Sequence, residues 1–502
     1  KKKKKQFAAC TLENWSLAAV VVSAMLGFIS YLSLGSTIRF AQDAGAIAGD
    51  TSTATAIKNG GILNATLNSL QPNDLFIIEN SSFAVMGGVQ VANLQSVTIQ
   101  IDGTLLFSDD IKAWPTRSDG SVLEALLFTA PKNVTFTSSG TGTLDGQGGK
   151  WWGIPGIGYL IRTENRPRLL HVEGGTDLLV ENLLFTRPPY WTTLFSGSEG
   201  LEIRNCEIDA RRDTDDGHDI IDITAFNTDG FDVTGNNVWI HDCVVWNQVR
   251  ILYGDWRGLI DVPHTSSPLH HPLACYGLFL PPPSSQDDCV AVKDGSSNMV
   301  IERLHASGLG LTIGSIGNSN VNNITFRDIT MKNTVKGVYL KFRGGGNISN
   351  VLFENVTMET PSQWAVWIGP AQQSDSKDLC APHPCSLCWP TLKTAQCNAP
   401  AAGQYTNITL RGITIDLKGK HAPGVILANA SAPMRNIIFE DVVVHNPGSF
   451  PGSSDKNYYC EGVESGVATG KTTPVPSCFK DETDAALLRR HELLGVAEKV
   501  QE

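Results

Sequence analysis

Eight segments of the chain are imperfect copies of one pattern. In it a residue that is mostly Asn precedes alternating apolar positions, which are followed by a residue that is mostly Asn or Asp and by further alternating apolar positions. The copies mostly recur at intervals in the twenties to thirties of residues. They lie at residues 177–185, 200–208, 237–245, 298–304, 323–331, 350–358, 407–415 and 435–444. Alternation of this kind is typical of strands with one buried face. Strand repeats at this period predict a solenoid, because each coil covers the inner side chains of the next.

Shorter alternating segments precede the repeats, at residues 74–79, 97–102 and 133–136, and residues 53–70 read as a short helix. No long amphipathic helices alternate with the strands, which disfavours a doubly wound sheet or a barrel. A β-sandwich is the competing all-β architecture, but it would not repeat one motif eight times. We therefore predict an all-β chain folded as a parallel β-helix.

One interval breaks the period. Asp229 and Asp288 are 59 residues apart, and residues 249–286 between them lack the strand pattern. Without those 38 residues the interval would be 21, which is one ordinary coil. The segment starts with Val and ends in Pro and Ser followed by Gln. An intron that begins with GT, contains a pyrimidine tract and ends with AG would give such residues if it were translated. We predict a non-native insertion from a retained intron, or otherwise a long surface loop.

The net charge is −11 although the chain opens with five Lys residues, so the remainder carries −16. An acidic body argues against nucleic acid as a partner. An anionic substrate would need a locally basic site.

Residues 1–36 have the features of a targeting segment. Residues 1–5 are cationic, and residues 15–34 form an uncharged run of 20. That length suits either a signal peptide or an N-terminal membrane anchor, which would leave the following residues outside the cell. We expect a secreted protein, or one anchored through residues 15–34, with a β-helix domain at 37–450 and a C-terminal disulfide loop and helical tail at 451–502.

Two further features agree with the secretory route. Sequons for N-glycosylation occur at eight positions, namely Asn64, Asn80, Asn133, Asn323, Asn347, Asn355, Asn407 and Asn429. Cysteines crowd two places, with Cys380, Cys385, Cys388 and Cys397 in one polar loop and Cys460 and Cys478 near the end. The first four could hold zinc, but disulfides are the better reading for a secreted chain.

Two short polar clusters carry the carboxylates that suggest chemistry. One spans residues 227–232 and includes Asp229, and the other contains Asp287 and Asp288. Hydrolysis of a glycosidic bond needs one carboxylic acid to protonate the leaving oxygen and one carboxylate to activate water or attack. A polar turn or a calcium-binding loop is the simpler reading of the three Asp residues alone.

The ordered set of motifs resembles glycoside hydrolase family 28, the polygalacturonase-like pectinases, over roughly residues 40–450. The motifs are Leu-Asp-Gly-Gln-Gly-Gly-Lys-Trp-Trp at 144–152, Arg-Pro-Arg-Leu-Leu at 166–170, Arg-Pro-Pro-Tyr-Trp at 187–191, Asn-Thr-Asp-Gly at 227–230, Gln-Asp-Asp-Cys at 286–289 and Ile-Gly-Ser-Ile-Gly at 313–317. The resemblance implies a single-stranded right-handed parallel β-helix and an inverting hydrolase. It implies that Asp287 is the general acid and that Asp229 and Asp288 hold and deprotonate water. A bend or bulge at Asp287 would aim both neighbouring Asp residues into the site.

Two positions depart from the family pattern. The family's Gly-His-Gly appears with Leu309 in place of the His, and its Arg-Ile-Lys appears as Tyr339, Leu340 and Lys341. In the family the Arg and Lys bind the sugar carboxylate, so Lys341 carries over, Tyr339 offers stacking instead, and Arg343 could substitute for the Arg. Lys293 is a further candidate for substrate contact. Sugar-stacking rings could come from Trp151, Trp152, Tyr190 and Trp191, of which we expect at least half to serve packing.

The resemblance predicts a glycosidase that cleaves pectin-type galacturonan, as a monomer, without cofactor or metal. The alternative is a catalytically impaired β-helix that binds polysaccharide in a wall or matrix, because the usual His and Arg are missing. A pectate lyase shares the fold but uses calcium and a basic residue, and the two Asp motifs argue against it.

Overall fold

The computed structural model of the chain describes residues 35–140, 142–152, 165–211, 227–247, 287–373, 380, 384–392 and 394–487. Nearly all of the predicted targeting segment, the whole of residues 249–286 and the chain beyond residue 487 lie outside this range. Among the helices of the described part, none is both long and apolar enough to cross a bilayer.

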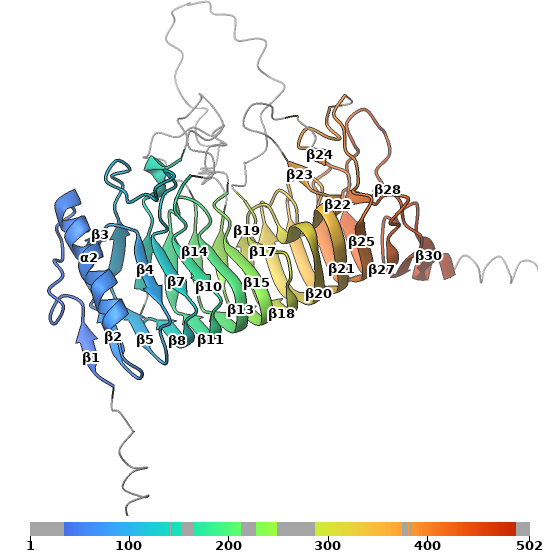
Figure 1. The fold of residues 1–502 in the computed structure, drawn as a ribbon. Helices are drawn as coiled ribbons and strands as arrows, with labels where there is room; N and C mark the ends of the chain where they lie inside the picture. The colour runs from blue at the N-terminus through green and yellow to red at the C-terminus, as the bar shows by residue number, and fades with distance from the viewer. Residues whose placement is uncertain are drawn as a thin grey trace, which may run out of the picture.

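The described strands form one elongated stack of coils, a right-handed parallel β-helix (Figure 1). In the described residues, twenty-eight strands join in one continuous sheet and pair in parallel, which confirms the predicted architecture. The early strands are β1 Thr37–Arg39, β2 Leu75–Ile78, β3 Ser82–Val85, β4 Val89–Ala92, β5 Thr98–Ile101, β6 Thr104–Phe107, β7 Leu126–Thr129, β8 Lys132–Thr137, β9 Gly142–Asp145, β10 Leu170–Glu173, β11 Thr176–Glu181, β12 Leu183–Thr186, β13 Thr193–Arg204, β14 Glu207–Asp209, β15 Phe231–His241 and β16 Val244–Trp246.

The later strands continue the same stack. They are β17 Val290–Val292, β18 Ser297–Glu302, β19 His305–Ser307, β20 Leu311–Lys332, β21 Val338–Glu359, β22 Val366–Pro370, β25 Gly403–Asp416, β26 Gly424–Leu427, β27 Arg435–His445, β28 Tyr459–Glu461, β29 Gly466–Gly470 and β30 Lys480–Thr483. Strands β23 Gln372–Gln373 and β24 Cys385–Ser386 form a separate pair.

The interior of the coils is a column of apolar side chains. Within each strand the inward residues alternate with outward ones, so that Phe231 and Val233 are buried in the core while Asp232 between them points out of it. Equivalent inward residues lie above one another along the axis, as in the stacked rings of Phe326 and Phe353, whose centroids are 4.6 Å apart. The apolar residues that repeat in the sequence are the ones that form this column.

The repeated Asn residues build a ladder at one corner of the coils. Asn350, Asn407 and Asn436 all adopt positive φ angles of 54–55°, a left-handed conformation that Asn tolerates well. The Nδ2 of Asn436 donates to Asn407 over 2.9 Å, and the Nδ2 of Asn407 donates to Asn350 over 3.0 Å. The same amide nitrogen would carry the sugar at the sequon of Asn407. Glycosylation there stays a prediction, in competition with the ladder.

The two ends of the stack are covered differently. Helix α2 Thr53–Ser69, predicted from the sequence, lies across the N-terminal coils and buries Leu63 and Leu67 (Figure 1). A 3₁₀ turn, η1 Gly148–Lys150, follows β9. At the C-terminal end residues 480–483 pair with β29 as strand β30, and a helical segment begins at residue 484.

Disulfides connect the cysteines that the sequence grouped. Cys380 pairs with Cys388, Cys385 with Cys397, and Cys460 with Cys478. The four-cysteine loop is therefore a doubly bridged segment, and the zinc alternative is wrong for it.

One outward row of side chains places the site, and we call it the site row. Parallel pairing aligns its members across successive coils, so their side chains leave the sheet on the same side. In order along the axis they are Asp232, Ala291, Thr312, Tyr339, Trp367, Val425 and Tyr459.

Candidate active site

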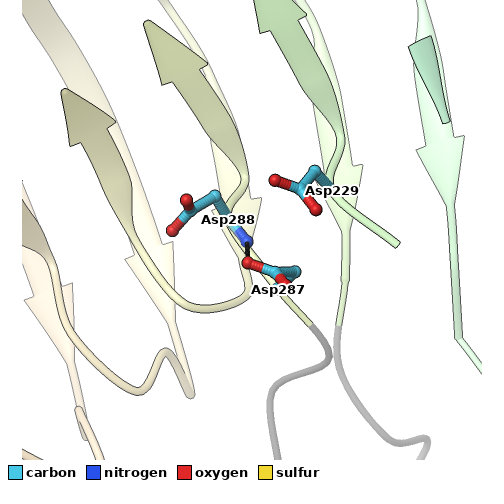
Figure 2. Close-up of side chains that lie close together, drawn as sticks. All are labelled: Asp229, Asp287 and Asp288. Atoms are coloured by element: carbon cyan, nitrogen blue, oxygen red, sulfur yellow. Dashed lines mark hydrogen bonds between the residues drawn. The ribbon is translucent and has the colours of Figure 1, made fainter. Parts of the chain in front are cut away.

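The fold brings Asp229, Asp287 and Asp288 together from two neighbouring coils. Asp229 lies just before β15 and the other two just before β17. The backbone N–H of Gly230 donates to the carbonyl of Asp288 over 2.9 Å, which fixes the two segments side by side. One carboxylate oxygen from each of the three residues lies within 4.8 Å of the others (Figure 2).

Backbone and amide donors hold the Asp287 carboxylate. Its Oδ2 accepts from the backbone N–H of Asn227 over 3.0 Å and from the Asn227 side chain over 3.2 Å. Its Oδ1 accepts from the backbone N–H of Asp288 over 2.8 Å. Both residues precede the strand, and the chain bends at Asp287, which is one of the two predicted alternatives, a bend or a bulge.

Two lysines neutralise the other carboxylates. Lys341 lies 3.0 Å from Oδ2 of Asp288, and both side chains are buried. Lys293 lies 3.4 Å from Asp229 and 2.7 Å from Asp232. The two lysines offset part of the negative charge of the cluster. The structure thus puts the predicted Lys293 and Lys341 directly against the predicted acids.

Asp232 and Thr312 belong to the site, although no role was assigned to them from the sequence. Asp232 is completely buried beneath Lys293, and the hydroxyl of Thr312 donates to Oδ1 of Asp288 over 2.6 Å. A signal for Asp232 was present, since it alternates with the inward Phe231 and Val233 in a strand that starts at the site. Thr312 carries no comparable signal, because its partner depends on the pairing of β17 with β20.

Burial and mutual repulsion shift the proton affinities of the acids. Burial, followed by the charges of Asp229 and Asp288, raises the pKa of Asp287 well above its usual value. Burial and the charge of Asp229 raise the pKa of Asp232 in the same way. Burial also raises the pKa of Asp229, against the opposing effect of Lys293. Oδ1 of Asp229 is buried and has no hydrogen-bond partner, so it can accept one from a water or a substrate.

Burial would lower the pKa of each of the two lysines, but their carboxylate neighbours outweigh it. The pKa of Lys293 is raised by Asp232 and Asp229, and that of Lys341 by Asp288. Both lysines therefore carry their charge at any working pH.

Tyr339 is placed differently from the expected sugar-stacking ring. It is 1% exposed, and its ring centre lies 4.1 Å from Nζ of Lys341 and 4.7 Å from Nζ of Lys336. Burial raises its pKa to about 12. Its ring supports Lys341 through a cation–π contact and has little surface left for a substrate. Arg343 is exposed on the same strand, two residues beyond Lys341.

Lys336 is a buried lysine that sequence reasoning missed. Its Nζ donates to Oε1 of Gln363 over 3.1 Å and lies 5.5 Å from the ring centre of Trp367. Burial, followed by the charge of Lys341, lowers the pKa of Lys336 to about 7. No local sequence pattern predicts that a lysine at this position is buried.

Of the four predicted stacking rings, three are buried, namely Trp151, Trp152 and Tyr190. Trp191 is partly exposed, and its ring centre lies 4.7 Å from Nζ of Lys293. It is the ring of this group that adjoins the carboxylates.

The fold and its carboxylate cluster define a β-helix protein with the kind of acidic site that glycoside hydrolases use. The model of the family "Glycosyl hydrolases family 28" matches residues 77–250 and 284–378, which is more than half of the chain. The chain belongs to this family. The match leaves out residues 251–283, nearly the whole of the segment that interrupts the repeats.

Curated relatives share about a quarter of their residues with the chain. An endopolygalacturonase from Emericella nidulans is 26% identical over 49% of this chain and 52% of its own length. An exopolygalacturonase from Cochliobolus carbonum is 23% identical over 56% and 54%. The chain spans about half the length of the curated relatives it matches.

Solved structures share the fold. The endo-xylogalacturonan hydrolase from Aspergillus tubingensis has a TM-score of 0.56 at 18% identity, covering 89% of this chain and 99% of that one. The exopolygalacturonase from Thermotoga maritima has a TM-score of 0.55 at 16% identity, covering 89% and 92%. These likenesses support the β-helix and leave the substrate open.

Proposed function

We propose that this protein is an inverting glycoside hydrolase that cleaves a pectin-type galacturonan. The observation that carries the proposal is the convergence of Asp229, Asp287 and Asp288, with one oxygen of each within 4.8 Å of the others, in a member of glycosyl hydrolase family 28. Hydrolysis of a glycosidic bond needs a proton donor and a carboxylate that handles water. The cluster contains groups suited to both roles.

Asp287 is the general acid in this proposal. Its raised pKa keeps it protonated where an ordinary Asp would be ionised. Its proton passes to the glycosidic oxygen as the bond to the anomeric carbon breaks.

Asp229 and Asp288 hold the attacking water. A water about 2.8 Å from an oxygen of each carboxylate would span the observed separation, which is at most 4.8 Å. Oδ1 of Asp229 still lacks a partner and can accept from that water. As the water oxygen bonds to the anomeric carbon, its proton passes to one of these carboxylates.

Lys341, Lys293 and Arg343 are the groups that we assign to binding a uronate carboxylate. Lys341 and Lys293 touch the catalytic carboxylates, so a bound uronate would share their charge with Asp288 and Asp229. Tyr339 contributes indirectly, because its ring makes a cation–π contact with the ammonium group of Lys341. The relatives named as polygalacturonases support a galacturonan as the substrate class.

We also propose an extracellular location, with a secreted or membrane-anchored chain. The three disulfides support it, because such bonds persist in oxidising compartments. The alternative function is a β-helix that binds polysaccharide without cleaving it. Leu309 favours that alternative, since the position of the family's His is occupied by an apolar side chain packed in an aromatic cluster.

Release of reducing ends from polygalacturonate and from rhamnogalacturonan separates these functions. The hydrolase should release reducing ends without the ultraviolet absorbance of an unsaturated product. Asp287→Asn should lower the rate about 10²–10⁴-fold or more while the fold persists. Unchanged turnover in Asp287→Asn would refute the assignment of the acid. Absence of turnover in the folded wild type on both polymers would favour the binding role.

A further inference from the structure

A cluster of aromatic rings extends from the carboxylates toward the C-terminal end of the molecule. Tyr339 meets Trp367 edge to face at 6.3 Å, Trp367 meets Trp389 at 5.9 Å, and Trp389 meets Tyr459 at 5.3 Å. Phe450 lies 6.4 Å from Tyr459. We call the three outer rings, Trp389, Phe450 and Tyr459, the aromatic platform.

The platform lies on the same side of the sheet as the active site. Tyr459 belongs to the site row, and so does Thr312, whose hydroxyl binds Asp288. Four strand pairings separate Thr312 from Tyr459 along the axis. At about 4.8 Å per pairing the platform lies roughly 19 Å from the carboxylates. A polymer that runs along the coil axis through the site would pass over it.

The platform is exposed and held in place. Tyr459 is 38% exposed, and Trp389 and Phe450 are partly exposed while packing on the buried rings beneath. Trp389 sits in the loop bridged by Cys380–Cys388 and Cys385–Cys397, and its carbonyl accepts from Nε2 of Gln372 over 2.7 Å. Such a surface loses little conformational freedom on binding.

The departures from the family pattern join this platform to the site. Tyr339 is a buried member of the aromatic cluster, and Leu309 packs against it. These two residues stand where the family's Arg and His would be, so an apolar and aromatic surface replaces polar groups beside the carboxylates. An acidic group contacts the platform, because the Tyr459 hydroxyl donates to Oε2 of the exposed Glu461 over 2.8 Å.

We propose that Trp389, Phe450 and Tyr459 form a distal binding surface for uncharged sugar rings of the polymer substrate. Aromatic faces bind the apolar faces of sugars, while the Glu461 carboxylate disfavours an ionised uronate in the same place. The sugar unit bound at the platform is therefore neutral or methyl-esterified. This proposal narrows the substrate class of the hydrolase, and it rests on the proposed function.

Calorimetric binding to the Asp287→Asn protein tests this surface without requiring turnover. The probes are a dimer and an octamer of galacturonate, each in free-acid and partly methyl-esterified form, so that a carboxylate remains for the active site. Tyr459→Ala is the test variant, Tyr459→Phe keeps the ring, and Trp239→Ala is the control. Trp239 is equally exposed, at 41%, but lies at the other end of β15, away from the site row.

The esterified octamer should bind about tenfold more weakly to Tyr459→Ala, which corresponds to about 1.4 kcal/mol, whereas the dimers should be unaffected. Tyr459→Phe and Trp239→Ala should bind like the parent. Equal affinity of Tyr459→Ala and the parent for the octamer, or no octamer binding by the folded parent, would overturn the proposal. Reducing-end release by the wild type is measured separately, so failure of the hydrolase assignment is told apart from failure of the platform.

Discussion

At the scale of single residues, three chemically identical carboxylates are distinguished by their partners. Asp288 has Lys341 and Thr312, and Asp229 has Lys293. Asp287 has backbone and amide donors together with two acidic neighbours. The acid and the bases of the proposed reaction follow from this asymmetry, as environments that push pKa values apart assign roles to paired acids.

The raised pKa of Asp287 predicts the pH dependence of activity. The acid must be protonated, so kcat on polygalacturonate should fall as pH rises past its pKa, which lies above about 3.9, the value of an ordinary Asp. The measurement is a kcat profile from acidic to neutral pH. A kcat that rises continuously to neutral pH would contradict the role of Asp287.

The same pKa predicts how stability depends on pH. The folded state binds the Asp287 proton more tightly than the unfolded state, so this residue's contribution to stability falls as pH rises from the unfolded pKa to the folded one. Asp287→Asn should therefore have a melting temperature that declines less between pH 4 and pH 7 than that of the wild type. If the melting temperatures of the two proteins fell equally between pH 4 and pH 7, the pKa of Asp287 would not be raised.

At the scale of the elements, the ladder of Asn side chains explains why the strands repeat as they do. Each ladder residue lies within its strand in the left-handed conformation and connects its coil to the next through a side-chain hydrogen bond. Apolar stacking fills the coils, while the ladder sets where each one turns.

Replacement of Asn407 tests the ladder. Asn407→Ala loses hydrogen bonds to Asn350 and Asn436 and keeps a side chain that disfavours φ of 55°. The free energy of unfolding should fall by about 2 kcal/mol. Asn407→Gly keeps the conformation accessible and should cost less. Denaturant unfolding of protein from a bacterial host measures both, and a larger loss for Gly than for Ala would contradict this account.

The elements that could be predicted from the sequence are those set by local pattern. Alternating apolar residues predicted the strands, and the repetition of one pattern predicted the β-helix. The sequence also predicted a helix at residues 53–70, and the helix of the structure follows Ser52 and spans residues 53–69. The lysine contacts were not predictable in the same way. Lys341 reaches Asp288 across 53 residues, and Thr312 reaches the same carboxylate only because β17 pairs with β20. Such contacts depend on register between coils.

At the scale of the whole molecule, the described residues that flank 249–286 lie side by side in the β-helix. The Nδ2 of Asn247 donates to the carbonyls of Asp287 and Asp288, over 3.1 and 3.3 Å. A chain that passes from residue 248 directly to Asp287 would therefore have little distance to bridge. The family match, which skips residues 251–283, supports an insertion.

Deletion of residues 249–286 should leave the fold and activity intact. The free energy of unfolding should change by about 1 kcal/mol or less, since loop closure depends weakly on length. Thermal unfolding and reducing-end release, compared with the full chain, test this. A deletion that folds but loses kcat would show instead that the segment takes part in catalysis, as a lid would. Sequencing of the transcript tests the intron origin.

The anomeric configuration of the first product tests the central claim most directly. The three carboxylate oxygens lie within 4.8 Å, closer than the spacing of about 6.5–9.5 Å that separates the two carboxyl groups of many inverting enzymes. If Asp229 and Asp288 hold water, that water attacks directly and the configuration inverts. Proton NMR of early polygalacturonate digests should then show the β-anomer from the α-linked polymer. Initial release of the α-anomer would mean that a carboxylate attacks first, and would contradict the proposed roles.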